Sequence, residues 1–151
     1  GGIHDYYPGT CLREESDILL RIRRAGHRIV FTPSAVVTHV AAPHPRGRRF
    51  DLRYQYYGHR NHIVLLTSTI GTRDPRTRRY VASVLREDIA GGLKEGAGAL
   101  VDSDLAPRAR IRRAGGRVLR AGVAAAGLVT GGVAAGRIAV AARRSASTPA
   151  P

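Results

Sequence analysis

The sequence predicts an α/β fold followed by a mainly helical tail. Two observations predict the α/β part: an amphipathic segment at 14–25 that ends in a glycine, and two β-branched stretches after it, at 28–31 and 35–39. A third observation, a run rich in Ala, Gly and Val at 118–142, predicts the helical tail. With 151 residues, the chain is long enough to form one ordinary domain with its own core.

The first predicted helix, at 14–25, rests on its apolar spacing and on its two ends. Its apolar residues recur at i, i+1, i+4 and i+7 and form one stripe: Ile18, Leu19, Ile22 and Ala25. Gly26 stands where a helix end favours a residue in the left-handed conformation. The two strands that follow are separated by Thr32-Pro33-Ser34, a typical turn sequence.

Three further segments are predicted to be helical. Residues 50–69 form the first, because apolar and aromatic side chains recur along one side of it. Asp74-Pro75 is a typical helix start, and that helix runs on towards Leu93, where several glycines weaken its end. The predicted organisation is a first unit at 1–69, a helical extension and linker at 70–104, an Arg-rich helical tail at 105–144 and a disordered terminus at 145–151.

The positive charge is concentrated in the tail. Residues 1–66 carry 10 basic and 5 acidic residues, residues 67–104 carry 6 of each, and residues 105–151 carry 9 arginines and no acid, which together give the net charge of +14. Nearly all basic residues are Arg in a chain rich in Ala and Gly, a bias typical of a GC-rich genome. We therefore expect no nucleic-acid partner, although a basic nucleic-acid-binding module is an alternative. The single cysteine, Cys11, excludes an internal disulfide and suits a reducing compartment.

The tail is predicted to lie on a membrane surface or a partner rather than to span a bilayer. Its longest uncharged run, from Ala121 to Gly136, has 16 residues, whereas a span needs about 20 mostly apolar ones. Its arginines favour an anionic surface. Two pairs of small residues four apart, Gly127 with Gly131 and Gly132 with Gly136, would allow close helix contact.

The order of features in residues 13–39 resembles a known enzyme family. An acidic pair, Glu14-Glu15, is followed by Asp17, a short helix, Gly26, two strands and a terminal His39. This order resembles the C-terminal half of the catalytic domain of family 2 inverting glycosyltransferases, which have the GT-A (Rossmann-like) fold. The resemblance covers about residues 1–66 and begins partway through that domain. It therefore implies a fragment that is inactive without its donor-binding half.

The resemblance implies a reaction and a set of catalytic residues. A sugar passes from a nucleotide-sugar donor to a cell-envelope or lipid-linked glycan acceptor, with inversion, at the cytoplasmic face of the membrane. Inverting transfer needs a base for the acceptor hydroxyl, and Glu15 inherits that role, with Glu14 and Asp17 beside it. Glu14 remains an alternative base. The three acids also suit the start of any helix, with Asp17 paired to Arg21.

The remaining candidate residues concern the metal and the substrates. The resemblance implies a divalent metal, Mn²⁺ or Mg²⁺, with His39 as one ligand and the others upstream; a strand-end histidine bonded to backbone is the alternative. The segment 54–62 also resembles family members, and its Arg60 would approach the diphosphate or the acceptor. Arg13, Arg60 and Tyr57 are the candidate substrate-binding residues, although core packing explains the tyrosines as well. A membrane-surface adaptor without catalysis is a further alternative.

Overall fold

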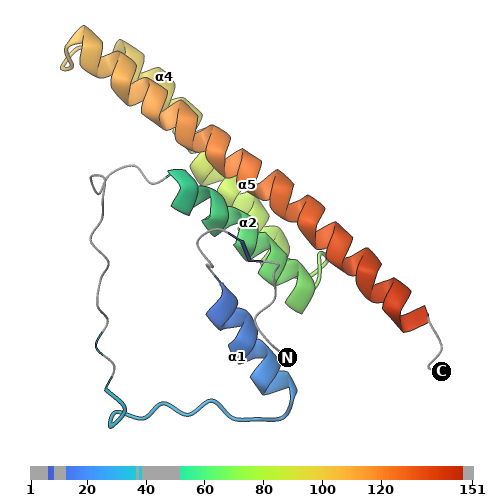
Figure 1. Cartoon of the computed structure of the whole chain (residues 1–151). Coiled ribbons are helices and arrows are strands. Elements are labelled where there is room, and N and C mark those ends of the chain that lie inside the picture. Colours follow the sequence, from blue (N-terminus) through green and yellow to red (C-terminus); the bar gives the residue numbers. More distant parts are fainter. Residues whose placement is uncertain (1–6, 9–12, 37, 39–51, 148–151) are drawn as a thin grey trace.

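The computed structural model describes residues 7–8, 13–36, 38 and 52–147, with side chains placed as far as residue 141. Every regular element in these residues is helical (Figure 1). In chain order the elements are α1 (Glu14–Arg24), α2 (Leu52–Thr69), α3 (Pro75–Ser83), the π-helix η1 (Val84–Gly91), α4 (Gly92–Val101) and α5 (Pro107–Ser147).

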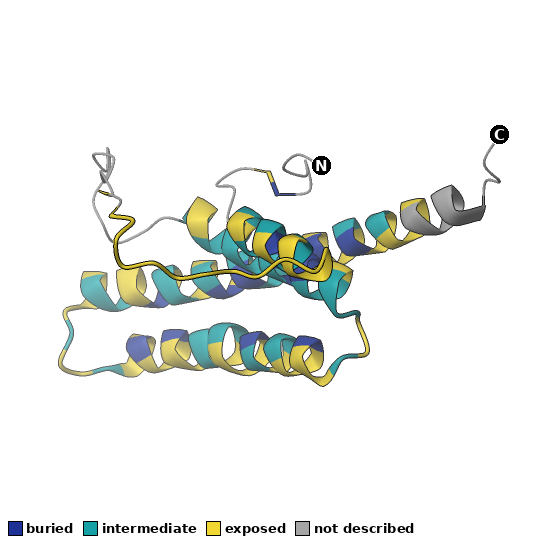
Figure 2. Ribbon diagram, turned by 90° about the horizontal axis from the view of Figure 1, so that it is seen from below, coloured by how far each residue is buried: buried dark blue, intermediate teal, exposed yellow. Residues whose placement is uncertain are grey.

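The 41-residue helix α5 is the axis on which the other helices pack. The helices α3, η1 and α4 follow one another without a break, and η1 and α4 run back antiparallel along the first half of α5 (Figure 1). The helix α2 lies along the middle of α5 in the same direction as α5, and α1 packs on α2 (Figures 1 and 2). The core is therefore a set of helix–helix seams, with buried residues on the facing sides of the helices (Figure 2).

The seam between α2 and α5 depends on two glycines. A Cβ atom added at Gly127 would lie 2.8 Å from the carbonyl oxygen of Tyr56 and 2.9 Å from Cβ of His59. One added at Gly131 would lie 2.6 Å from the carbonyl oxygen of Arg60 and would overlap the Ile63 side chain. Only glycine allows the two backbones to approach this closely. The close contact predicted for the first pair of small residues is therefore confirmed, and its partner is α2 of the same chain.

The seam between α4 and α5 uses small residues on both helices. Ala114, Ala121 and Ala124 are buried along α5. Across from them, a Cβ at Gly92 would lie 3.4 Å from Cβ of Ala121, and one at Gly96 would lie 3.3 Å from the Val118 side chain. Gly92 and Gly96, which were predicted to weaken this helix, instead allow α5 to pack closely. The continuous run of α3, η1 and α4 extends through them to Val101.

The predicted helix ends are confirmed where the structure describes them. After α1, Gly26 has φ of +85°, and the N–H groups of Gly26 and His27 donate to the carbonyl oxygens of Arg23 and Ile22. These two bonds form the Schellman motif. Before α3, the Asp74 carboxylate accepts a 2.8 Å hydrogen bond from the backbone N–H of Arg76, and Pro75 occupies the first helical position. The end of the chain predicted to be disordered is helical through Ser147, and residues 148–151 lie outside the described residues.

The apolar stripe predicted for α1 is not its buried face. Leu19 and Ile22 remain 43% and 37% exposed, whereas Asp17 is buried and Leu20 packs on the cluster of Tyr7, Val64 and Leu65. The buried Asp17 carboxylate forms an ion pair with Arg21 of the same helix, 3.1 Å away. Pairing reduces the cost of burying a charge.

The predicted α/β fold is wrong for the part of the chain that the structure describes. Within 28–31 and 35–39, all described residues are irregular, and no described segment pairs with them. Val30, Phe31 and Val36 are 73%, 90% and 86% exposed. β-branched residues favour strands only where a neighbouring strand and a packed face are present, and both are missing here. The turn between the two stretches does form, since the Ala35 N–H donates to the Thr32 carbonyl oxygen at 3.3 Å.

Adding one methyl group at Gly131 should destabilise the protein. Gly131→Ala forces the Arg60 carbonyl and Ile63 away from α5, and overpacking of this kind costs about 1–3 kcal/mol. The matched control is Gly132→Ala, where an added Cβ meets nothing within 4 Å. That variant should gain up to about 1 kcal/mol from helix propensity. Urea unfolding measures both, and equal stability changes in the two variants would contradict close packing at Gly131.

Candidate functional site

The predicted acidic motif divides between a buried and a solvent-facing part. Asp17 is buried beside Tyr7 and bound to Arg21, as the helix-start interpretation expected. Burial, together with the negative charge of Asp17, raises the pKa of Tyr7 to about 12. By contrast, Glu14 is half-buried and Glu15 is exposed. Asp17 therefore holds α1 in place, whereas the Glu15 carboxylate remains accessible to a substrate.

The predicted substrate residues Arg13 and Arg60 lie on different elements, Arg13 just before α1 and Arg60 within α2. Arg13 precedes α1 in the left-handed conformation, with φ of +80°, which is uncommon for a residue with a side chain. Arg60 donates from Nη1 to Oδ1 of Asn61 at 2.7 Å. The fully buried Asn61 amide in turn donates to the carbonyl oxygen of Pro8 at 3.5 Å. Asn61 of the Arg-Asn pair bonds to Pro8, and Asp17 of the acidic motif lies beside Tyr7. The two motifs therefore approach each other through residues 7–8.

The tyrosines of α2 make contacts within the protein. The Tyr56 hydroxyl donates to Oγ1 of Thr130 on α5 at 2.9 Å, which adds a polar bond to the glycine seam. The Tyr57 ring meets the Tyr56 ring edge-on, with centroids 5.0 Å apart, and the Arg53 guanidinium lies 5.9 Å from its centroid. These contacts agree with the packing interpretation of the two residues. A substrate role for Tyr57 stays a prediction.

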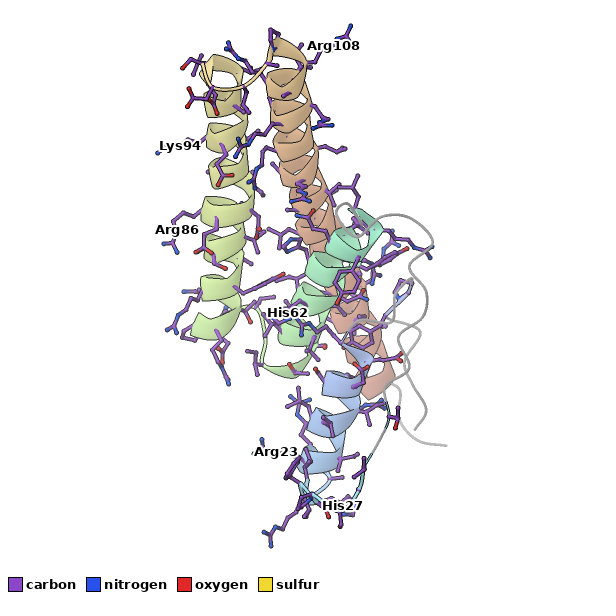
Figure 3. The ribbon with its side chains drawn as sticks, turned by 90° about the vertical axis from the view of Figure 1, so that its left-hand side faces the viewer. Arg23, His27, His62, Arg86, Lys94 and Arg108 are labelled. Carbon is purple, nitrogen blue, oxygen red and sulfur yellow. The ribbon has the colours of Figure 1, made fainter. Side chains whose placement is uncertain are left out.

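A histidine–tyrosine cluster joins α2 to α3, and sequence reasoning did not identify it. The His59 Nδ1 atom lies 3.0 Å from the Tyr80 hydroxyl, and the His62 ring centroid lies 4.3 Å from that of Tyr80. His62 sits where α2 meets α3 (Figure 3). Its Nδ1 atom is buried and has no hydrogen-bond partner in the structure. The sequence signal was present, because histidines three residues apart share one side of a helix.

Burial determines the protonation of this cluster. Burial, together with the nearby positive charge of Arg13, lowers the pKa of His62 from 6.5 to about 4. Burial also lowers the pKa of His59 and raises that of Tyr80 to about 12. At neutral pH all three side chains are therefore uncharged. This protonation state suits a packed junction between two helices.

The described residues do not form a metal site. No three His, Cys, Asp or Glu side chains among them come together in a way that could hold a metal ion. His39, the predicted ligand, lies outside the described residues, as does Cys11. The implied Mn²⁺ or Mg²⁺, with its other ligands upstream, therefore stays a prediction, and no chemical step is assigned to a metal.

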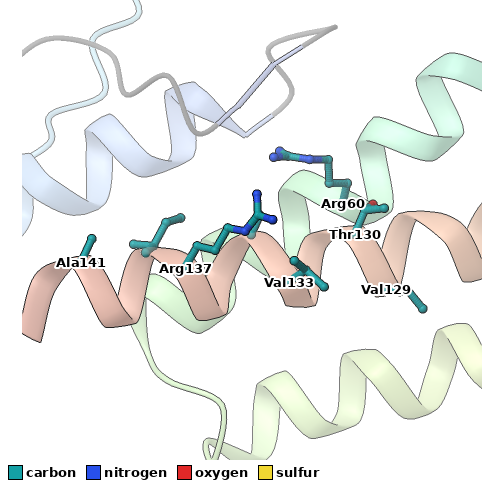
Figure 4. Close-up of a pocket in the computed structure, with 8 residues that line it drawn as sticks. Arg60, Val129, Thr130, Val133, Arg137 and Ala141 are labelled. Atoms are coloured by element: carbon teal, nitrogen blue, oxygen red, sulfur yellow. The ribbon is translucent and has the colours of Figure 1, made fainter.

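A surface hollow lies along α5, beside α2. We call it the arginine groove, and its volume is about 570 Å³. Among the described residues its lining is mainly apolar, with two arginines and no acid: Arg60, Val129, Thr130, Val133, Ala134, Arg137, Ile138 and Ala141. In Figure 4 the Arg60 and Arg137 side chains extend from α2 and α5 to the same side of α5. Sequence reasoning identified Arg60 and the tail separately but could not place them together.

By length and composition, one helix of the described chain is suited to cross a membrane. It is α5 from Pro107 to Ala141, with a mean hydropathy of 1.6 over its most apolar stretch. Only 22% of that stretch is buried in the protein. Since the core helix of a soluble protein would be mostly buried, the exposure of α5 is the feature that most needs a functional explanation.

The comparisons with known proteins give no family for this chain. No protein-family model, no curated protein and no solved structure matches it. The resemblance to family 2 glycosyltransferases therefore rests on the residues of the sequence alone.

The buried histidines should make the protein less stable in mild acid. The unfolded chain takes up a proton on His62 below about pH 6.5, whereas the folded chain resists it down to about pH 4. Stability is therefore complete above pH 6.5 and falls as the pH drops towards 4. Because the ring is partly solvated, we expect a loss of about 1 kcal/mol between pH 7 and pH 5. Urea unfolding at both pH values measures it.

The control for this prediction is His62→Gln, which cannot titrate in this range. The variant should keep a smaller pH dependence, due to His59. If its stability fell by as much as that of the unaltered protein between pH 7 and pH 5, the assignment to His62 would be wrong.

Proposed function

We propose that this chain is a membrane-associated helical module, which α5 holds at the surface of an anionic membrane. The observation that carries the proposal is the exposure of apolar side chains on a helix with arginines and no acid. Val129, Val133 and Val140 on α5 are 66%, 53% and 50% exposed. Exposed apolar residues on a basic helix are what an interfacial membrane helix uses, because both the hydrophobic effect and anionic lipid attract it.

Two features of α5 favour a surface location over a span. A spanning α5 would have to leave α2 and so lose the Gly127 and Gly131 contacts and the bond between Tyr56 and Thr130. It would also place Arg137 in or close to the bilayer, where a charged side chain is unfavourable. We therefore place the helix at the membrane surface, and we propose the cytoplasmic face because anionic lipids are concentrated there.

The arginines of α5 supply the attraction to that surface. After Leu105 the chain carries 9 arginines and no acid, and each basic residue close to an anionic membrane contributes about 1 kcal/mol. Part of this charge is used within the protein, since Arg113 and Arg117 pair with Asp102 and Glu95 at 3.8 and 3.0 Å. Both pairs are largely exposed, so they weaken the attraction only slightly.

A second candidate function is the acceptor side of an inverting sugar transfer. The observation that favours it is the convergence of the acidic motif and the Arg60-Asn61 pair on Tyr7 and Pro8, although these segments are far apart in the sequence. In this proposal the exposed Glu15 takes the proton of the acceptor hydroxyl, and residues outside the described helices bind the nucleotide-sugar. A lipid-linked acceptor would reach Glu15 at the membrane to which α5 is bound.

Membrane binding should be electrostatic and reversible. We expect the protein to sediment with vesicles of phosphatidylglycerol and phosphatidylcholine but to bind vesicles of phosphatidylcholine alone much less. Washing with 1 M salt, where the Debye length is about 3 Å, should release it. Retention through high salt and alkaline carbonate would show that α5 spans the bilayer. Equal binding to both kinds of vesicle would remove the electrostatic basis of the proposal.

The sugar-transfer proposal predicts different effects for the two neighbouring glutamates. In the full-length protein, supplied with a panel of nucleotide-sugars and lipid extract, Glu15→Gln should reduce turnover by about 10²-fold or more while donor binding is kept. Glu14→Gln is the matched control and should retain most of the activity. A large loss in Glu14→Gln alone would transfer the role of base to Glu14. Undiminished turnover in both variants would exclude this pair as the source of the base.

A further inference from the structure

The arginine groove combines an apolar lining with two guanidinium groups. Of the eight described residues that line it, five are Val, Ala or Ile, and Thr130 is the neutral polar one. The α5 residues of the lining lie at 129, 130, 133, 134, 137, 138 and 141, a spacing that places them on one face of the helix. A ligand that fits the groove must therefore be apolar along its length and negatively charged at one point.

Arg60 is positioned to bind an anion at that point. Its Nη1 atom donates to Asn61, whose side chain is fully buried and bonded to the Pro8 carbonyl oxygen. The bond to Asn61 uses one of the five N–H donors of the guanidinium and orients Arg60. Preorganised arginine is favoured for phosphate because its planar donors match two phosphate oxygens.

Arg137 supplies the second positive charge. It is exposed, and it is the only charged residue between Ala121 and Ala142. A second hollow of about 540 Å³ shares Val133, Arg137 and Ala141 with the groove and extends past them to Gly136 and Val140. Arg137 therefore stands between two apolar hollows, which gives room for an apolar chain on each side of one anionic group.

We propose that the arginine groove binds one anionic membrane phospholipid, with its phosphate between Arg60 and Arg137 and its acyl chains in the two hollows. This inference rests on the proposed function and adds a defined lipid site to it. Charge complementarity favours this occupant, because none of the described residues that line the two hollows is acidic. Each hollow, at about 570 and 540 Å³, falls within the size range of ligand-binding pockets. The general attraction of the other arginines brings the protein to the membrane, and the groove then holds one lipid molecule.

The test uses a short-chain phospholipid that stays monomeric in solution. Titration calorimetry of the folded chain with dihexanoyl phosphatidylglycerol should give saturable binding of one lipid per chain. Dihexanoyl phosphatidylcholine, whose phosphate is neutralised by its own choline, should bind much more weakly. Inorganic phosphate should compete poorly because it lacks the chains that fill the hollows.

The variants separate the groove from the general charge of α5. Arg137→Gln should weaken phosphatidylglycerol binding roughly tenfold, the effect expected from losing one charge-assisted contact. Arg112→Gln removes the same charge from an exposed position of α5 outside the groove and should change binding less than twofold. Arg60→Lys keeps the charge without the planar donors and should also weaken binding. Circular dichroism confirms that each variant is folded.

The outcomes distinguish the lipid site from membrane binding in general. If Arg137→Gln and Arg112→Gln weakened binding equally, the groove would not be the site, although α5 could still bind anionic vesicles. Binding that inorganic phosphate displaced completely would show a phosphate site without lipid and would overturn the inference. If the unaltered protein failed to bind anionic vesicles at all, the proposed function itself would fail.

Discussion

The close approach of α2 and α5 at Gly127 and Gly131 is the constraint on which the rest of the structure depends. Backbone meets backbone there, and an added Cβ would collide with carbonyl oxygens of α2. Because α2 is held against α5, Tyr56 reaches Thr130, and Arg60 reaches the hollow beside Arg137. The same contact turns the buried side of α2, with Asn61 and Val64, towards residues 7–8 and α1. Both the arginine groove and the contact of α2 with residues 7–8 therefore depend on the packing of α2 on α5.

The packing of α5 explains how an apolar helix can belong to a folded chain and still face a membrane. On two of its sides, small residues allow α2 and the continuous helices η1 and α4 to pack closely against it. Its larger side chains, Val129, Val133 and Val140, are left exposed. Burying these valines at a membrane surface would stabilise the bound state without unfolding any seam, since each buried CH₂ contributes about 0.8 kcal/mol. The fold and the proposed membrane contact then use different faces of the same helix.

Sequence reasoning predicted the elements that local signals determine and failed where distant partners decide. Gly26 and the pair Asp74-Pro75 correctly marked helix ends, because capping depends on a few neighbouring residues. The β-branched stretches at 28–31 and 35–39 were assigned to strands, but strand formation needs a partner that periodicity cannot supply. The burial of Asp17 in place of Ile22 was missed for the same kind of reason. It depends on contacts with Tyr7 and Arg21 rather than on the apolar pattern of the helix.

In the candidate sites, too, single residues could be identified from the sequence, but their contacts with residues distant in the chain could not. Arg60 and the basic tail were each identified from sequence, yet only the packing of α2 on α5 places Arg60 beside Arg137. The His59, His62 and Tyr80 cluster joins two helices across the turn at Gly71; the spacing of the two histidines was visible in the sequence, but only the fold shows that Tyr80 packs on them.

The central claim is that α5 stays packed on α2 when the protein binds a membrane. Electron spin–spin distance measurement tests it most directly. Nitroxide labels would be placed at the exposed positions Arg53 on α2 and Val140 on α5, with Cys11 replaced by serine. The account predicts the same narrow distance distribution in solution and on anionic vesicles. A longer or much broader distribution on the vesicles would show that α5 leaves α2 to enter the bilayer, and it would contradict the account.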